Sequence, residues 1–335
     1  MLPTQVKIKD IVKLFSCCET NANKKLHPLS KDKYKVTNWS SYNEGLKQRG
    51  SLTLWIDSDI TSHWTDASEH KRGGQKVYSA LAIESCLTVR KVYHLPLRQT
   101  EGFIKSIFGL LNVALPVPCY TTLCRRSNGL AVNLAAANGA VTDIVVDSTG
   151  LKVYGEGEWK VRKHGAGKHR TWMKLHIAAN GQTQQIEAIA LTSNAVDDAT
   201  GMESLMSQIN KPVKRFIGDG AYDKDKVRKQ LHKDNIKQVI PPQRNAVSDK
   251  KKRLHRAQRD EAIEAVKATG RKEWKIKEDY HQRSKAETVM FRYKTIIGDK
   301  LAARKTAHQK TGVAVGCKIL NIMLQTTKPQ SRKIA

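Results

Sequence analysis

The chain has 335 residues, and 39% of them are hydrophobic, which is enough to bury a sizeable core in one large domain or two ordinary ones. It carries 59 Lys and Arg residues against 31 Asp and Glu residues, so its formal net charge is +28. This positive charge is spread along the chain and favours nucleic acid as the partner, although ribosome-associated and simply basic proteins have similar compositions.

The sequence argues against a zinc site, secretion and membrane insertion. The six cysteines form no CxxC pair, and no His spacing completes a zinc site. The N-terminus is too polar for a secretory signal, and no apolar run approaches the length that spans a bilayer. We therefore expect a cytoplasmic protein with reduced thiols and no membrane partner.

Residues 1–138 are expected to form an N-terminal helical region. Residues 1–70 show no clear period, so this segment gives no prediction. Apolar residues recur at helical spacing in residues 75–93, and again from about Thr100. The residues expected on the apolar face of the first of these helices are Tyr78, Leu81, Val89 and Val92.

A third short helix is expected after Pro118, because proline favours the start of a helix. It would carry Arg125 and Arg126 in an early turn. Three short helices of which the last is basic suggest a helix-turn-helix over residues 75–130 that contacts DNA. The alternative is a helical unit that serves only packing.

After Gly139 the pattern changes to strands and helices in the order β-β-β-α-β-α-β-α. This order is that of a ribonuclease-H-like domain, an α/β fold with a mixed five-stranded sheet and flanking helices, expected over residues 139–325. The last helix is expected from Tyr280 to Ile297, after a basic insertion at about 243–279. The five strands are expected within residues 142–155, 171–180, 184–193, 214–223 and 237–242.

Three carboxylates are candidates for a metal site in this domain. Asp147 lies in the first strand between apolar residues, where an unpaired charge is costly. Asp219 ends the fourth strand, which neighbours the first in this strand order. Glu287 lies on the last helix, where Tyr280, Arg283 and Lys294 share its stripe at about 3.6 residues per turn.

These all-oxygen ligands suit Mg²⁺, for which Mn²⁺ can substitute. Two such ions about 3.5 to 4 Å apart can activate a nucleophile and stabilise the leaving oxygen at phosphorus. Asp143 shares a face with Asp147, but solvation at the strand's entrance explains it. Asp223 is an alternative to Asp219, although it resembles the N-cap of the next helix.

Two further features of the sequence suggest contact with DNA. Residues 160–170 form a glycine-containing connection between two strands, which resembles a hairpin tip that contacts phosphates. Trp274 in the basic insertion could stack on a displaced base, but an indole that anchors the insertion to the core is the commoner case. The basic residues of the connection are Lys160, Arg162, Lys163, Lys168 and Arg170, with His164 and His169 beside them.

The spacing Tyr280-x2-Arg283-x3-Glu287-x6-Lys294 resembles the Y-R-E-K signature of bacterial insertion-sequence transposases. The segments VVDSTGLKVYGEGEWK and IGDGAYD are similar to the first and second Asp motifs of the insertion-sequence five family. The resemblance covers roughly residues 75–325, including the segment LRQTEGF.

The resemblance implies a DDE transposase whose metal ligands are Asp147, Asp219 and Glu287. It also implies that Tyr280, Arg283 and Lys294 contact DNA phosphates near the transposon end. The expected partners are the terminal inverted repeats and the target DNA, with a homo-oligomer when DNA is bound and a place near the bacterial nucleoid. The alternatives are a ribonuclease-H-like junction resolvase and a DNA-binding regulator that has lost catalysis.

Overall fold

The computed structural model describes residues 33–56, 58–66, 77–134, 143–153 and 172–334. The chain divides into two compact units, Met1–Trp39 with Pro329–Ala335, and Ser40–Lys328. In the first unit, strand β1 (Lys33–Val36) pairs antiparallel with β8 (Ser331–Ile334). The larger unit holds every residue of the candidate site.

The N-terminal part of the larger unit is helical, as predicted. Its helices are α2 (Trp39–Gln48), α3 (Ala80–Val92), α4 (Leu97–Leu110) and α5 (Tyr120–Arg126), with 3-10 turns at Leu52–Leu54 and Ser58–Thr61.

Helix α3 starts later than the predicted helix, because the Ser79 side chain accepts a hydrogen bond from the Ala82 backbone N–H and caps the helix there. The predicted face is partly wrong. Leu81 is 40% exposed, whereas Ala82, Ile83 and Cys86 are buried.

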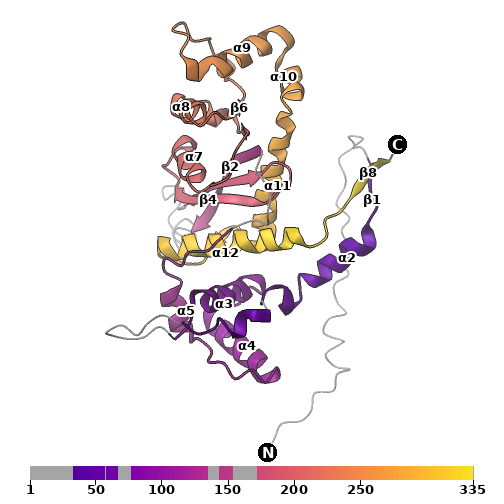
Figure 1. The fold of residues 1–335 in the computed structure, drawn as a ribbon, viewed down its shortest axis with the longest axis vertical. Helices are drawn as coiled ribbons and strands as arrows, with labels where there is room; N and C mark the ends of the chain where they lie inside the picture. The colour runs from indigo at the N-terminus through magenta and orange to yellow at the C-terminus, as the bar shows by residue number, and fades with distance from the viewer. Residues whose placement is uncertain (1–32, 57, 67–76, 135–142, 154–171, 335) are drawn as a thin grey trace, which may run out of the picture. The chain divides into compact units, whose positions relative to one another are not determined.

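The sheet has the strand order β4-β3-β2-β5-β6, with β7 added beside β2 (Figure 1). Strand β3 runs antiparallel to both of its neighbours, β2 and β4, whereas β5 runs parallel to β2 and β6 runs parallel to β5. This is the predicted ribonuclease-H-like topology. The strands are β2 (Asp143–Val153), β3 (Trp172–Asn180), β4 (Ile186–Ser193), β5 (Arg215–Ile217), β6 (Lys237–Val239) and the unpredicted β7 (Lys300–Leu301).

Helices cover both faces of this sheet. Ile144 and Val146 of β2 pack with α7 (Asp198–Met206) and α8 (Asp225–Lys233), whereas Val145 packs on the opposite face. That opposite face is covered by α9 (Ala257–Thr269), α10 (Arg271–Lys277) and α11 (Ser284–Arg292). Successive side chains of a strand alternate between faces, so Asp147 lies on the α11 side with Val145.

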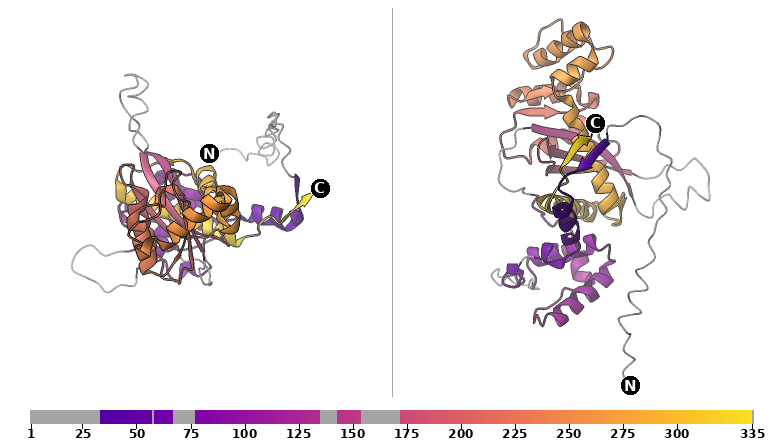
Figure 2. Two further views of the ribbon diagram at one scale, coloured as in Figure 1. Left: turned by 90° about the horizontal axis from the view of Figure 1, so that it is seen from above. Right: turned by 90° about the vertical axis from the view of Figure 1, so that its right-hand side faces the viewer.

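Helix α12 (Thr306–Gln325) lies between the N-terminal helices and the sheet (Figures 1 and 2). Its residues Val313 and Ile319 belong to one buried cluster together with Ile83 of α3, Leu123 of α5 and Leu175 of β3. The N-terminal helices and the sheet therefore share a hydrophobic core. The predicted boundary near residue 138 lies outside the described residues and stays a prediction.

Amide side chains cover both edges of the sheet. At the β4 edge, Asn321 accepts from the Ile186 N–H and donates to the Ile186 carbonyl, both at 2.8 Å. Gln208 donates to the Ile189 carbonyl at 2.9 Å. At the β6 edge, Gln258 accepts from the Gln238 N–H at 2.8 Å. These side chains occupy backbone groups that an added strand would use.

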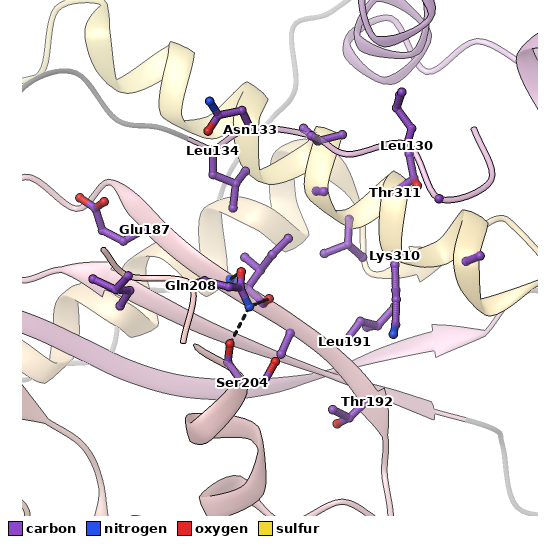
Figure 3. A pocket seen from close by; sticks show the side chains of 18 of the residues that line it. Leu130, Asn133, Leu134, Glu187, Leu191, Thr192, Ser204, Gln208, Lys310 and Thr311 are labelled. Atoms are coloured by element: carbon purple, nitrogen blue, oxygen red, sulfur yellow. Dashed lines mark hydrogen bonds between the residues drawn. The ribbon is translucent and has the colours of Figure 1, made fainter. Parts of the chain in front are cut away.

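A cavity of about 750 Å³ lies beside the covered β4 edge. Figure 3 shows Gln208 there, with its hydrogen bond to Ser204, and Lys310 and Thr311 on the side of α12. The lining is mixed, and Lys211, which forms an ion pair with Glu187 at 3.7 Å, belongs to it.

Candidate active site

Parallel pairing of β2 with β5 places Asp147 and Asp219 at equivalent positions. Val145 of β2 pairs with Ile217 of β5, and each aspartate follows two residues later along its chain. Asp147 Oδ1 accepts from the Ser148 backbone N–H at 2.8 Å. The two carboxylates therefore lie at equivalent positions on two neighbouring chain segments, Asp147 in the middle of β2 and Asp219 just beyond the end of β5.

Asp219 also shapes the turn that follows β5. Its Oδ1 accepts from the Ala221 backbone N–H at 2.9 Å and caps a short 3-10 helix at Gly220–Tyr222. The cap fixes the direction in which the chain leaves the strand, and leaves Asp219 partly exposed to solvent.

Arg283 connects the other two candidate carboxylates. Its Nη1 lies 3.4 Å from Asp147 Oδ2, and its Nη2 donates to Glu287 Oε1. The side chain of Asp147 is 17% exposed and that of Glu287 is 52% exposed, so the pair spans the boundary between core and solvent. One guanidinium thus offsets the negative charge of a strand residue and a helix residue.

The segment that carries Glu287 combines three helical forms. It begins with a 3-10 turn at Tyr280–Arg283, continues as α11, and ends in a π-helical turn at Tyr293–Ile297. The prediction of one exposed stripe is wrong, because Tyr280 is only 8% exposed while Lys294 is exposed. Arg283 and Glu287 do lie side by side, one turn apart.

The three carboxylates act electrostatically on the same groups. Burial raises the pKa of Asp147, and the negative charges of Asp219 and Glu287 raise it further, against the lowering effects of the Ser148 N–H and Arg283. Burial raises the pKa of Tyr280 too, and all three carboxylates contribute to that rise. Asp147, Asp219 and Glu287 therefore share one electrostatic site.

The donor set fits a hard divalent cation in chemical type, because every candidate ligand is a carboxylate oxygen. Within the described part of the chain, no three His, Cys, Asp or Glu side chains lie close enough to hold one metal ion. Here Arg283 supplies the compensating charge. A metal held by all three carboxylates would require these side chains to close around it.

Asp143 and Asp223, the two alternative ligands, are both paired with arginines. Asp143 is 6% exposed and receives two hydrogen bonds from Arg215, at 2.9 and 2.8 Å, so solvation does not explain it. Asp223 does not cap the next helix, whose N-cap is Lys224. It is buried, and ion pairs join it to Arg228 at 2.9 Å and to Arg259 at 3.0 Å.

Trp274 anchors the basic insertion to the sheet. It is 4% exposed, and its ring centroid lies 6.0 Å from that of Tyr280 in a buried cluster with Val145, Ile217 and Val239. Trp274 is therefore an indole that anchors the insertion to the core, which is the commoner of the two interpretations given for it. In this position the indole supports the backbone that leads into Arg283.

The structure separates the predicted DNA contacts. Arg125 is exposed, whereas Arg126 is partly buried and donates to the Tyr78 carbonyl at 2.9 Å. Both lie in the last turn of α5, so their prediction for an early turn is wrong. The residues of the predicted hairpin tip lie outside the described residues: Lys160, Arg162, Lys163, Lys168 and Arg170, with His164 and His169.

The sequence did not reveal the arginines that flank the site. Arg228 is 1% exposed and contacts Gln238 and the Ile240 carbonyl as well as Asp223. Arg259 reaches the same carboxylate from the insertion, 36 residues further along the chain. Ion pairs between residues so far apart in the sequence leave no periodic pattern. Only the alternation of acidic and basic residues indicated these ion pairs.

Two chemical findings complete the description. Cys86, Cys119, Cys124 and Cys317 are free thiols. A search of the described helices finds no segment with the length and apolar character needed to cross a membrane.

Comparisons with known proteins identify the family of the chain. A family model described as "Transposase DDE domain" matches residues 141–322, and a second model of the same description matches residues 47–156. The first match contains all three candidate carboxylates.

Solved structures with similarity to the chain include transposases bound in complexes. The Drosophila P element transposase strand transfer complex has 14% identity over 60% of this chain and 47% of that chain, with a TM-score of 0.30. This chain therefore spans less than half of that relative. The piggyBac transposase synaptic complex with hairpin DNA has 10% identity over 88% of this chain and 77% of that chain, with a TM-score of 0.39.

The family follows from the model matches rather than from these distant structures. The model for residues 141–322 covers more than half of the chain and includes Asp147, Asp219 and Glu287. The protein belongs to the transposases with a DDE domain, which are metal-dependent phosphoryl transferases.

Proposed function

We propose that this protein is the transposase of a bacterial insertion sequence, related to the insertion-sequence five family. It would cut DNA at the element's terminal inverted repeats and join the freed 3′-hydroxyl groups to target DNA. The observation that supports this most is the placement of Asp147 and Asp219 at equivalent positions after the paired residues Val145 and Ile217, with Arg283 between Asp147 and Glu287.

In this proposal Asp147, Asp219 and Glu287 would hold Mg²⁺, or Mn²⁺ in its place, which would supply Lewis-acid chemistry for phosphoryl transfer. Asp147 would fix the site to the middle of β2, and Asp219 would fix it to the end of the paired strand β5. Glu287 would be the more exposed ligand, on α11. Arg283 stabilises the carboxylates in the absence of metal and contacts a DNA phosphate when metal is bound.

Further DNA contacts are proposed for the basic surface. Lys294 is exposed beyond α11, and Tyr280 lies at the base of the site, where its ring contacts Trp274. Arg125 and Arg126, together with the predicted hairpin tip of residues 160–170, would contact the element end. Two ends must be held together for joining, so a homo-oligomer is expected when DNA is bound.

The test is an incubation of purified protein with labelled element ends and Mg²⁺. We expect Asp147→Asn, Asp219→Asn and Glu287→Gln each to reduce cleavage by at least about a hundredfold, because each removes a metal ligand. Glu203→Gln is the matched control, because Glu203 is an exposed carboxylate on α7 that forms an ion pair with Lys226. Full cleavage by any of the three site variants would contradict the proposal.

The two alternative functions give different products in the same assay. A junction resolvase would cut branched DNA and would not join a preprocessed 3′ end to target DNA. A regulator would bind the repeats, and the wild-type protein would cleave nothing with Mg²⁺ or Mn²⁺. Joined product from the wild-type protein, absent from the Glu287→Gln variant, would support the transposase.

A further inference from the structure

A second cavity, away from the three carboxylates, combines apolar walls with a group of basic side chains. It has a volume of about 640 Å³ and lies where α3 ends, α4 begins, α5 ends and α12 begins. Leu87 and Val315 contribute apolar wall. Its volume is within the range of about 300 to 1,000 Å³ that is typical of small-molecule sites.

The charge of the lining is strongly positive. Among the described lining residues, Asp299 is the single aspartate or glutamate, and its carboxylate binds Lys152 at 2.8 Å. The negative charge of Asp299 is therefore already compensated by Lys152. The basic side chains that line the cavity are Arg90, Lys91, His94, Lys300, Arg304, Lys305 and His308.

Lys91 and Arg90 place two neighbouring basic side chains in the lining of the cavity. Burial lowers the pKa of Lys91, and the neighbouring positive charge of Arg90 lowers it further. Arg90 donates a hydrogen bond to the Leu95 carbonyl at 3.2 Å. Because a carbonyl is neutral, this contact does not compensate the positive charge of Arg90. A negatively charged group in the cavity would relieve the repulsion between these two neighbouring cations.

The beginning of α12 adds backbone donors to the same cavity. The helix has 20 residues, and its N-cap residue, Lys305, makes no side-chain cap. The first N–H groups of an α-helix have no carbonyl partner within the helix, and they favour an anion there. The Gln309 side-chain nitrogen donates to the Ala303 carbonyl at 2.9 Å.

We propose that this cavity binds a phosphate group through Lys91, Arg90, Arg304 and the first turn of α12. The phosphate could belong to a DNA backbone or to a free nucleotide, which offer the same anionic oxygens. The proposal does not depend on catalysis at Asp147, Asp219 and Glu287. Occupancy would join α3 of the N-terminal helices to α12, which also packs on the sheet.

The test measures thermal unfolding of the full chain with inorganic phosphate, against chloride at matched ionic strength and without divalent metal. The variants are Lys91→Met and Arg304→Gln. The control is Lys105→Met, which removes one exposed positive charge from α4 outside the cavity. Each variant is compared with its own phosphate-free Tm, so a change in basal stability does not affect the result.

We expect phosphate to raise the Tm of the wild-type protein and of Lys105→Met equally. The apparent Kd for phosphate should increase about tenfold or more in Lys91→Met, since a charged hydrogen bond contributes about 1.5 to 3 kcal/mol. An equal phosphate response in Lys91→Met and wild type would overturn the proposal. So would a phosphate response no larger than that to chloride.

Two further titrations distinguish the sources of the phosphate. A nucleoside monophosphate that binds tighter than inorganic phosphate, with duplex binding unchanged in Lys91→Met, would identify a free nucleotide. Weaker duplex binding in Lys91→Met than in Lys105→Met would identify the DNA backbone. Neither titration uses cleavage, so an inactive catalytic site would leave both results interpretable.

Discussion

Arg283 contacts Asp147 and Glu287 at once and so holds a positive charge where the proposed metal would bind. We expect Arg283→Gln to reduce DNA cleavage at saturating Mg²⁺ by about 10-fold to 100-fold, because it removes the proposed charged hydrogen bond to a DNA phosphate. The Mg²⁺ concentration for half-maximal cleavage should decrease, because the competing cation is gone.

The measurement is a Mg²⁺ titration of cleavage for the wild type, Arg283→Gln and Arg253→Gln. Arg253 forms its ion pair with Asp249 in the insertion, so its removal changes net charge equally without touching the three carboxylates. A higher Mg²⁺ requirement in Arg283→Gln would show that Arg283 helps to form the metal site and does not compete with it.

His176 is fully buried on β3 and shares a hydrogen bond with Thr192 at 2.9 Å. Burial lowers its pKa, Lys174 adds to this effect, and Asp198 and Asp197 oppose it. The contact with Asp198 is 3.6 Å long, too long to reverse the effect of burial. The folded protein therefore binds this proton less readily than the unfolded chain.

This difference in proton binding determines how the free energy of unfolding depends on pH. The free energy of unfolding should fall as the pH drops below about 6.5, where the unfolded histidine gains a proton. We expect the free energy of unfolding of His176→Gln to fall less steeply with decreasing pH than that of the wild type. Urea unfolding between pH 7 and pH 5 measures this difference. His232→Gln, an exposed histidine on α8, should keep the wild-type slope. Identical slopes for the wild type and His176→Gln would contradict this account.

At the scale of elements, Asp223 connects α8 to the basic insertion. Removal of its charge would leave the buried Arg228 without its closest carboxylate. We expect Asp223→Ala to lower the free energy of unfolding by about 3 to 5 kcal/mol, the cost of breaking a buried pair. Chemical denaturation measures this cost.

The matched control for that measurement is Glu203→Ala, which breaks the exposed pair between α7 and Lys226. Its expected cost is about 0 to 1 kcal/mol. Equal costs for the two variants would show that the Asp223 pair contributes no more than a surface pair.

The order of the strands and helices along the chain could be predicted because it depends on local signals, and the three carboxylates stay a prediction. Asp147 follows a buried apolar run, and Asp219 lies in a Gly-Asp-Gly turn. The helices of the insertion could not be predicted from apolar period. Helix α9 buries only Ala262 and Ile263, and a small alanine contributes little to a hydrophobic pattern.

The partners of Asp143 and Asp223 could not be predicted either, since Arg215 and Arg259 are distant in sequence and meet them only in the folded sheet. The three helical forms around Glu287 had no signal, because a change from 3-10 to α to π depends on packing. Tyr280 is buried there because Trp274 and the sheet cover it. Local periodicity placed Arg283 beside Glu287 and failed beyond one turn.

At the scale of the whole molecule, the shared core around α12 relates the N-terminal helices to the sheet. Ile83 of α3 and Leu175 of β3 belong to one buried cluster that includes Val313 of α12. A change at the N-terminal helices can therefore reach the sheet through packed side chains. The proposed phosphate cavity lies at the start of the same helix.

The amide side chains at the sheet edges limit how copies of the protein can associate. Asn321 and Gln208 occupy backbone groups of β4, and Gln258 occupies one of β6. Sheet extension from one copy to another would first have to displace these side chains from both borders. Association during transposition would then rely on helical surfaces and on the DNA itself. Crowded, newly made chains would also be less prone to join into fibrils through this sheet.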